Sequence, residues 1–293
     1  MKGSFEFARL ISVIILTFTH TRHNYSEGFI YIILEEMPKY GTLILSLISG
    51  YLYYSVSKNS KKLFSKKIKT LAIPYLIANL SVLIIVLLAN ILFDLDYLVR
   101  LGYDIRLFLD GILSLSSPPI NPPTFFIRDI FIIFVLIEVV INKKFLLSLL
   151  LIPILIYGEL ILRYEILFLF ITGVVIARYI TSNNKTLIAF NLLVISCILF
   201  FFEIIEIRHL VSIQVFILIV GWNINFPNVG GYTYLLHLYH SPVIVFIFPI
   251  INNYISNPVV SVFLQIILSI IIIYILFKIT RRYTFLSFLS GQR

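Results

Sequence analysis

Long apolar runs recur along this chain from its first residues to its last, and they constrain its fold more than any other feature. Of its 293 residues, 60% are hydrophobic and 13% are charged, whereas soluble domains average about 25% charged residues. A helix needs about 20 predominantly apolar residues to cross the hydrocarbon core of a bilayer. The pattern therefore predicts a polytopic membrane protein, and it excludes a soluble enzyme, a nucleic-acid-binding domain and a disordered tail.

The breaks between the runs predict an all-α bundle of ten transmembrane helices. Because the connections are short, we expect one integral-membrane domain over residues 1–293, with its longest polar loop at 94–123. The expected helices cover residues 5–21, 40–57, 70–93, 124–142, 145–161, 163–180, 186–203, 208–222, 231–251 and 258–279.

The distribution of lysine and arginine predicts the orientation of this bundle. If both termini are cytoplasmic, the inner segments hold more than twice as many lysine and arginine residues as the outer segments, as the positive-inside rule requires. The first run carries Glu6 and Arg9 and has no small-residue cleavage site, so we expect a permanent helix rather than a signal peptide. The sole cysteine, Cys197, lies inside an apolar run, which excludes an intrachain disulfide.

The first predicted helix carries three ionisable residues, Glu6, Arg9 and His20. Each is a candidate for function, because a charge in the hydrocarbon costs at least ~2.5–3.5 kcal/mol. In one continuous helix all three share a face, since Arg9 and His20 are about three turns apart. Imidazole can act as a general base, and arginine is suited to bind phosphate or carboxylate. The structural alternative is that Arg9 reaches back to the inner surface and His20 is interfacial.

The ninth predicted helix contains Tyr234, His237 and His240, and the two histidines share a face. They are either site residues or histidines bonded to backbone and tyrosine hydroxyls. A metal site would need a third ligand. The sequence supplies none, so we expect no metal.

Two further groups of charges stand out. Arg128 and Asp129 lie at the start of the fourth predicted helix. Because adjacent helical residues diverge by about 100°, we expect these two side chains to serve different partners. The alternative is that Asp129 simply neutralises the helix N-terminus.

Six lysines lie within residues 58–69. They serve either topology and attraction to anionic lipid or capture of a polyphosphorylated cofactor.

Five short blocks occur in a characteristic order. They are Glu6-x-x-Arg9 followed by ten residues and then His20, Ser49-Gly50-Tyr51, the basic stretch Lys66, Lys67 and Lys69 leading into Ile73-Pro74-Tyr75, the block from Pro123 to Arg128-Asp129, and Tyr234-Leu-Leu-His237. Together they resemble the acyltransferase 3 family, integral-membrane O-acyltransferases that modify bacterial surface glycans. The chain departs from that pattern where Phe125 replaces a tryptophan, Glu6 replaces an aspartate, lysines replace arginines in the basic stretch and His240 is additional.

The resemblance implies a multi-pass protein of the bacterial cytoplasmic (inner) membrane. The donor would be acetyl-CoA or another acyl-CoA from the cytoplasm, and the acceptor a hydroxyl of a cell-surface polysaccharide or its lipid-linked precursor. His20 would be the catalytic base, Arg9 would position the donor, and Glu6 would belong to the same catalytic group. Binding roles would fall to Arg128, Asp129, Tyr234, His237, Lys66, Lys67 and Lys69.

Several alternatives remain open at this stage. The acyl group moves either directly to the sugar or through a transient acyl-enzyme. A transporter or flippase for lipid-linked sugars would also carry intramembrane charges, although the sequence shows no repeated broken helices. A non-catalytic scaffold would not need the charges on the first helix. The expected partners are the donor, the acceptor and membrane lipids, without nucleic acid, and a homo-oligomer is open.

Overall fold

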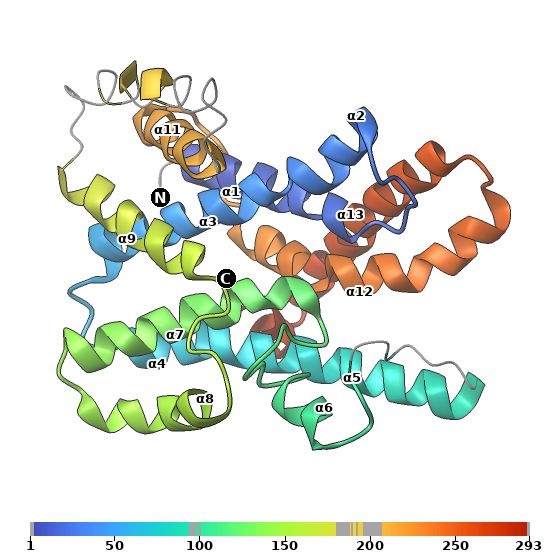
Figure 1. Ribbon diagram of the computed structural model, residues 1–293, viewed down its shortest axis with the longest axis horizontal. Coiled ribbons are helices and arrows are strands. Elements are labelled where there is room, and N and C mark those ends of the chain that lie inside the picture. The colour runs from blue at the N-terminus through green and yellow to red at the C-terminus, as the bar shows by residue number, and fades with distance from the viewer. Residues whose placement is uncertain are drawn as a thin grey trace. The chain divides into compact units, whose positions relative to one another are not determined.

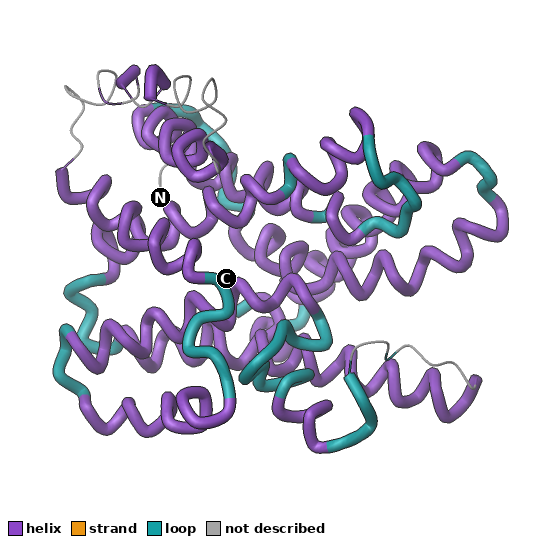
Figure 2. The backbone as a smooth tube through the Cα atoms, in the orientation of Figure 1, coloured by secondary structure: helices purple, strands orange, loops and turns teal. Residues whose placement is uncertain are grey.

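A computed structural model describes residues 3–93, 98, 101–179, 188, 190, 191, 193–195 and 207–291. Within these ranges the chain is helical and contains no strand, as Figure 2 shows. The predicted all-α class is therefore confirmed. Most of the expected helix 186–203, including Cys197, lies outside the described residues.

The α-helices vary from a single turn to about seven turns in length. They are α1 (Gly3–Leu16), α2 (Gly28–Tyr31), α3 (Lys39–Leu52), α4 (Leu63–Lys67), α5 (Ile73–Phe93), α6 (Ile105–Leu109), α7 (Phe125–Val140), α8 (Ile152–Tyr157), α9 (Tyr164–Tyr179), α11 (Ile207–Gly221), α12 (Gly230–Tyr254) and α13 (Pro258–Arg282) (Figure 1).

Shorter 3-10 and π-helical segments extend or link these helices. The 3-10 segments are η1 (Phe18–His20), η5 (Pro122–Thr124), η6 (Phe145–Leu151) and η7 (Thr284–Ser290). The π-helical segments are η2 (Ile32–Glu36), η3 (Tyr53–Ser57) and η4 (Ile68–Ala72).

Most of the predicted helices are confirmed to within a few residues, and three differ. The α-helical part of the first ends at Leu16 and continues as a 3-10 turn. The third begins at Leu63, so Lys66, Lys67 and Lys69 are helical residues rather than loop residues. The fifth is a 3-10 segment followed by six residues of α-helix, instead of one helix over 145–161.

In the part of the chain that the structure describes, three helices are long and apolar enough to cross a membrane. They cover Leu63–Leu92, Gly230–Tyr254 and Pro258–Arg282, with mean hydropathies of 2.5, 1.7 and 2.9. On α5 the side chains of Ile84, Ile85, Leu88 and Ile91 are all at least 48% exposed. An exposed apolar row of this kind is typical of a surface that faces lipid. The chain has the character of a membrane protein.

Capping side chains explain where α13 and α6 begin. Asn257 precedes α13, and its Oδ1 accepts hydrogen bonds from the backbone N–H groups of Val259 and Val260, while Pro258 occupies the first helical position. Asp104 caps α6 in the same way, accepting from the backbone N–H of Arg106 at 2.8 Å.

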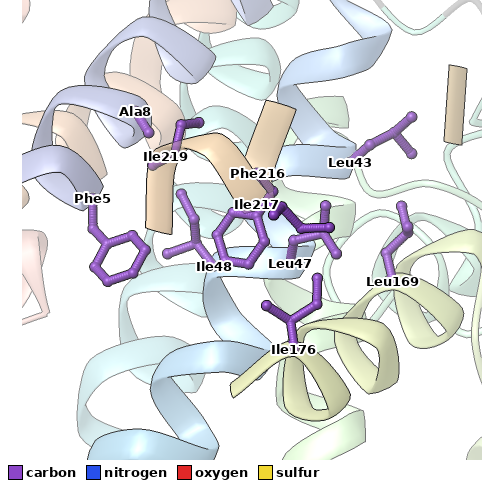
Figure 3. Packing of buried hydrophobic residues seen from close by; sticks show 10 residues of the cluster. All are labelled: Phe5, Ala8, Leu43, Leu47, Ile48, Leu169, Ile176, Phe216, Ile217 and Ile219. Atoms are coloured by element: carbon purple, nitrogen blue, oxygen red, sulfur yellow. The ribbon is translucent and has the colours of Figure 1, made fainter. Parts of the chain in front are cut away.

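The helices form two compact units, Met1–Lys61 with Glu165–Thr233, and Lys62–Tyr164 with Tyr234–Arg293. In the first unit α3 packs against α1 and α11, and apolar side chains from these helices and α9 form its core (Figure 3). The core residues are Phe5, Ala8, Leu43, Leu47, Ile48, Leu169, Ile176, Phe216, Ile217 and Ile219.

Glycines allow the helices of the first unit to approach closely. A Cβ on Gly50 would lie 1.9 Å from the carbonyl oxygen of Phe170, and a Cβ on Gly173 would lie 2.2 Å from that of Leu47. The backbones of α3 and α9 therefore meet at two glycines, which is the packing that small residues permit in membrane helices.

In the second unit α7 packs against α4, η4 and η6, and η7 packs against α5 and α13. The rings of Phe64 and Phe131 stack with centroids 6.3 Å apart between α4 and α7. Nζ of Lys67 lies 3.8 Å from the centroid of the Phe134 ring. These contacts hold the basic helical turn against α7.

Candidate functional site

A buried ion pair on α1 is the chemically most distinctive feature of the first unit. Nη1 of Arg9 donates to Oε1 of Glu6 at 3.2 Å. The side chain of Glu6 is 3% exposed and that of Arg9 is 22% exposed, so the acid is enclosed while part of the arginine side chain reaches the surface of the unit. The prediction that these two residues share a helical face is confirmed, and the structure adds that they form an ion pair.

The second oxygen of Glu6 faces the first residue of α12. Oε2 is buried and has no hydrogen-bond partner among the described residues, and a Cβ on Gly230 would lie 3.4 Å from it. A carboxylate at a helix N-terminus is stabilised by the partial positive charge of the unpaired backbone N–H groups there. This placement explains how a buried acid is tolerated with one ion-pair partner.

His20 is half-buried and lies at the end of the 3-10 segment η1. The expectation that it shares a face with Arg9 assumed 3.6 residues per turn throughout. A 3-10 segment has 3.0 residues per turn and a rise of about 2.0 Å per residue, so the spacing rule of a continuous α-helix does not give the direction of the His20 side chain. The alignment of His20 with Arg9 stays a prediction.

The next histidine along the chain is a useful comparison. Nδ1 of His23 accepts from the backbone N–H of Tyr25 at 3.2 Å, and its Nε2 lies 3.4 Å from Oε1 of Glu35. Both ring nitrogens of His23 therefore face groups of the same unit, an arrangement typical of a structural histidine.

The first two sequence blocks meet in this unit. The ring of Tyr51, from the Ser49-Gly50-Tyr51 block, lies 5.1 Å from that of Phe5, next to Glu6. It also packs edge-on against Phe216. The helix with the ion pair is thereby joined to α3 through aromatic contacts.

In the second unit Arg128 and Asp129 bind one another, so the expectation of different partners was wrong. Nη1 of Arg128 donates to Oδ1 of Asp129 at 2.8 Å. The long arginine side chain turns back across the 100° that separates adjacent helical residues, because in a buried environment an unpaired charge is more costly than a bent side chain.

Both members of this pair also bind the same stretch of backbone. Arg128 donates to the carbonyl oxygens of Leu160 at 2.9 Å and Glu159 at 2.6 Å. Asp129 accepts from the backbone N–H groups of Leu162 at 3.2 Å and Arg163 at 3.0 Å. The side chains are 4% and 0% exposed. The pair therefore holds the backbone of residues 159–163 in place. Of the polar side-chain atoms of the pair, only Nε of Arg128 has no hydrogen-bond partner among the described residues.

The three lysines with predicted binding roles, Lys66, Lys67 and Lys69, differ in exposure. Lys66 and Lys69 are exposed, whereas Lys67 is half-buried over Phe134. Lys66 and Lys69 are thus accessible to an anion. The arrangement is compatible with either lipid headgroups or a soluble phosphate.

Tyr234 and His237 are buried in the second unit. The ring of His237 packs edge-on against Phe126 with centroids 5.5 Å apart. His240 is fully buried and donates from Nδ1 to the carbonyl oxygen of Leu236 at 2.7 Å. Tyr234 lies beside Gly291, where a Cβ would be 3.2 Å from its Cε1. The fourth and fifth sequence blocks are in contact through Phe126 and His237.

A buried network of amides and hydroxyls was missed by the sequence analysis. Asn79 on α5 donates through Nδ2 to Thr124 Oγ1 at 3.0 Å, and its Oδ1 accepts from the backbone N–H of Asn121 at 3.1 Å. Asn121 in turn donates through Nδ2 to the carbonyl oxygen of Leu238 at 2.7 Å. The sequence did contain a signal for this network, because Asn79 is a polar residue inside an apolar run, one helical turn after Tyr75.

Glu138 was also missed as a buried charge. Its side chain is 0% exposed, and Nζ of Lys144 lies 2.5 Å from its Oε2. Pairing with the lysine that follows the helix gives it a structural explanation. Among the described residues no cluster of three histidine, cysteine, aspartate or glutamate side chains is placed to hold a metal ion.

Comparison of the chain with protein-family models, curated proteins and solved structures finds no match. The function must therefore be argued from the residues and their contacts.

Proposed function

We propose that this protein is a membrane-embedded O-acyltransferase with ten spans and cytoplasmic termini. It would move an acyl group, acetyl first among the candidates, from a cytoplasmic acyl-CoA to a hydroxyl of a cell-surface polysaccharide or its lipid-linked precursor. The observation that supports this most is the Glu6–Arg9 pair on a helix that leads into the turn ending at His20. The ordered sequence blocks on which the family resemblance rests add support.

The proposed reaction is a single acyl transfer. A ring nitrogen of His20 takes the proton of the acceptor hydroxyl, and the resulting oxygen nucleophile attacks the thioester carbonyl. The carbon–sulfur bond breaks, the CoA thiolate leaves, and the proton on His20 neutralises it. The partly exposed guanidinium of Arg9, held by Glu6, is suited to bind an anionic or carbonyl oxygen of the donor. Exposed Lys66 and Lys69 are suited to attract the CoA phosphates.

The remaining predicted residues take supporting roles in this proposal. An arginine can donate to the oxyanion of an acyl transfer, but the contacts of Arg128 with Asp129, Leu160 and Glu159 favour a structural role. Buried His237 and Tyr234 are kept as binding candidates.

The test is release of free thiol from acetyl-CoA by the protein purified in detergent, with and without candidate sugar acceptors. We expect release by the wild type and a loss of about 10²–10⁴-fold in His20→Ala, the typical contribution of a general base. Arg9→Ala should also lose most activity. His23→Ala and Arg22→Ala are matched controls from the neighbouring segment and should retain it.

Two outcomes would overturn the proposal. Unchanged thiol release by a folded His20→Ala protein would reject His20 as the base. If neither acetyl-CoA nor longer acyl-CoAs are consumed or raise the thermal midpoint of the wild type, the acyltransferase is rejected and transport of lipid-linked sugars becomes the next function to test.

A further inference from the structure

Helix α12 continues through Pro242, and this proline leaves one backbone group without its usual partner. Proline has no N–H, so the carbonyl oxygen four residues earlier, that of Leu238, loses its helical hydrogen bond. Leu238 is 0% exposed. A buried carbonyl without a donor is costly, and prolines in apolar helices persist where neighbouring groups satisfy it.

A side chain from elsewhere in the second unit supplies the missing donor. Nδ2 of Asn121 donates to the carbonyl oxygen of Leu238 at 2.7 Å, across 117 residues of sequence. Asn121 is 1% exposed, so water does not compete for this bond. The amide thus takes the role that a backbone N–H at position 242 would otherwise fill.

The donor is held in place by its own hydrogen bonds. The backbone N–H of Asn121 donates to Oδ1 of Asn79 at 3.1 Å, and its carbonyl oxygen accepts from Oγ1 of Thr124 at 2.8 Å. Asn79 is anchored on α5 through Nδ2, which donates to the carbonyl oxygen of Tyr75 at 2.9 Å. The network connects α5 and the start of α7 to one carbonyl of α12.

We infer that Asn121 is a positioning residue: it replaces the N–H that Pro242 lacks and thereby fixes the direction of the α12 turn that carries His237. His237 directly precedes Leu238, and its ring packs on Phe126, which follows Asn121 closely in the sequence. The same short segment therefore contacts both the histidine ring and the adjoining carbonyl. The link to catalysis rests on the proposed function, whereas the replacement of the N–H does not.

A double-mutant cycle tests the replacement directly. Asn121→Ala should lower the thermal midpoint of the purified protein by about 2–6 °C, because it leaves a buried carbonyl unsatisfied. In the Pro242→Ala background the new alanine supplies a backbone N–H to the carbonyl of Leu238. In that background Asn121→Ala should lower the thermal midpoint by less than half as much as it does in the wild type. Pro249→Ala, at the other proline of α12, is the matched control and should give no such rescue.

The inference is overturned if Asn121→Ala lowers the thermal midpoint equally in the Pro242→Ala and wild-type backgrounds. It is also overturned if Pro249→Ala reduces the effect of Asn121→Ala as much as Pro242→Ala does. If Asn121→Ala alone does not fold, recovery of folded protein by adding Pro242→Ala supports the inference, and failure of that recovery contradicts it.

The positioning of His237 is tested with thiol release, well below the unfolding temperature of each variant. Asn121→Ala and His237→Ala should each raise the KM for acetyl-CoA by about 10- to 100-fold, and the double variant should be no worse than His237→Ala. An unchanged KM in folded Asn121→Ala would reject the positioning role. Absence of thiol release from the wild type would instead reject the proposed function, while the thermal cycle still decides whether Asn121 replaces the missing donor.

Discussion

The two units each contain a buried acid paired with an arginine, and the two pairs differ in what their oxygens and nitrogens contact. In the first unit Glu6 uses one oxygen for Arg9, and the side chain of Arg9 remains 22% exposed. In the second unit both oxygens of Asp129 accept hydrogen bonds, and Arg128 donates to two backbone carbonyls besides the aspartate. From sequence alone Glu6 and Arg9 were placed with the catalytic residues, whereas Arg128 and Asp129 were expected to serve different partners.

The difference between the two pairs shows that the hydrogen bonds a charged residue already makes within the protein indicate whether its role is structural or chemical. A pair whose donors and acceptors are directed at one backbone segment stabilises that segment and has little capacity left for a ligand. The side chain of Arg9 is 22% exposed, so an external anion can approach it, whereas the 4% exposed side chain of Arg128 is enclosed. This is why the proposed reaction relies on Arg9 rather than Arg128.

The sharpest test of this comparison replaces each carboxylate by its amide. Asp129→Asn places an NH2 group where the carboxylate accepts from Arg128, Leu162 and Arg163, so we expect a loss of about 2–4 kcal/mol in the free energy of unfolding. Glu6→Gln keeps an oxygen that accepts from Arg9, and Oε2 of Glu6 has no hydrogen-bond partner to lose among the described residues, so this change should cost only about 1 kcal/mol. Thermal or denaturant unfolding in detergent measures both; equal losses would remove the distinction between the pairs.

A second prediction concerns the packing of the first unit, which depends on backbone approach rather than on polar bonds. Gly50→Ala places a methyl group 1.9 Å from the carbonyl oxygen of Phe170, so α3 and α9 must separate at a cost of about 1–3 kcal/mol or more. The control is Gly102→Ala, whose nearest neighbour is 3.8 Å away. Unfolding curves for the two variants that coincide would contradict this account.

The smallest predicted effect distinguishes lysines that pack from lysines that only contribute charge. Lys67→Ala removes the contact with the Phe134 ring and should cost about 0.5–1 kcal/mol. Lys66→Ala changes an exposed side chain and should stay within about 0.5 kcal/mol of wild type. The two unfolding midpoints give the comparison, and a larger loss in Lys66→Ala would show that the basic turn is held in another way.

The positions of most helices were predictable because apolar runs in a membrane protein leave the backbone few alternatives to a helix. The pairing of Glu6 with Arg9 was predictable because a spacing of three residues brings side chains together on any α-helix. The fifth predicted helix, over 145–161, was right only in part, because the helical residues end at Tyr157 and the first seven of them form a 3-10 segment. Apolar content does not distinguish an α-helix from the 3-10 segment that forms there.

Contacts between distant segments lay outside the reach of the sequence. No spacing rule pairs Arg128 with the carbonyls of residues 159 and 160, or Asn121 with Leu238, because the loops between them set those distances. The sequence by itself determined the all-helical class, the membrane character and the ionisable residues available for chemistry. Only the tertiary structure decided which of them are satisfied by the protein, because a buried polar group takes its role from the partners that folding brings within hydrogen-bond distance.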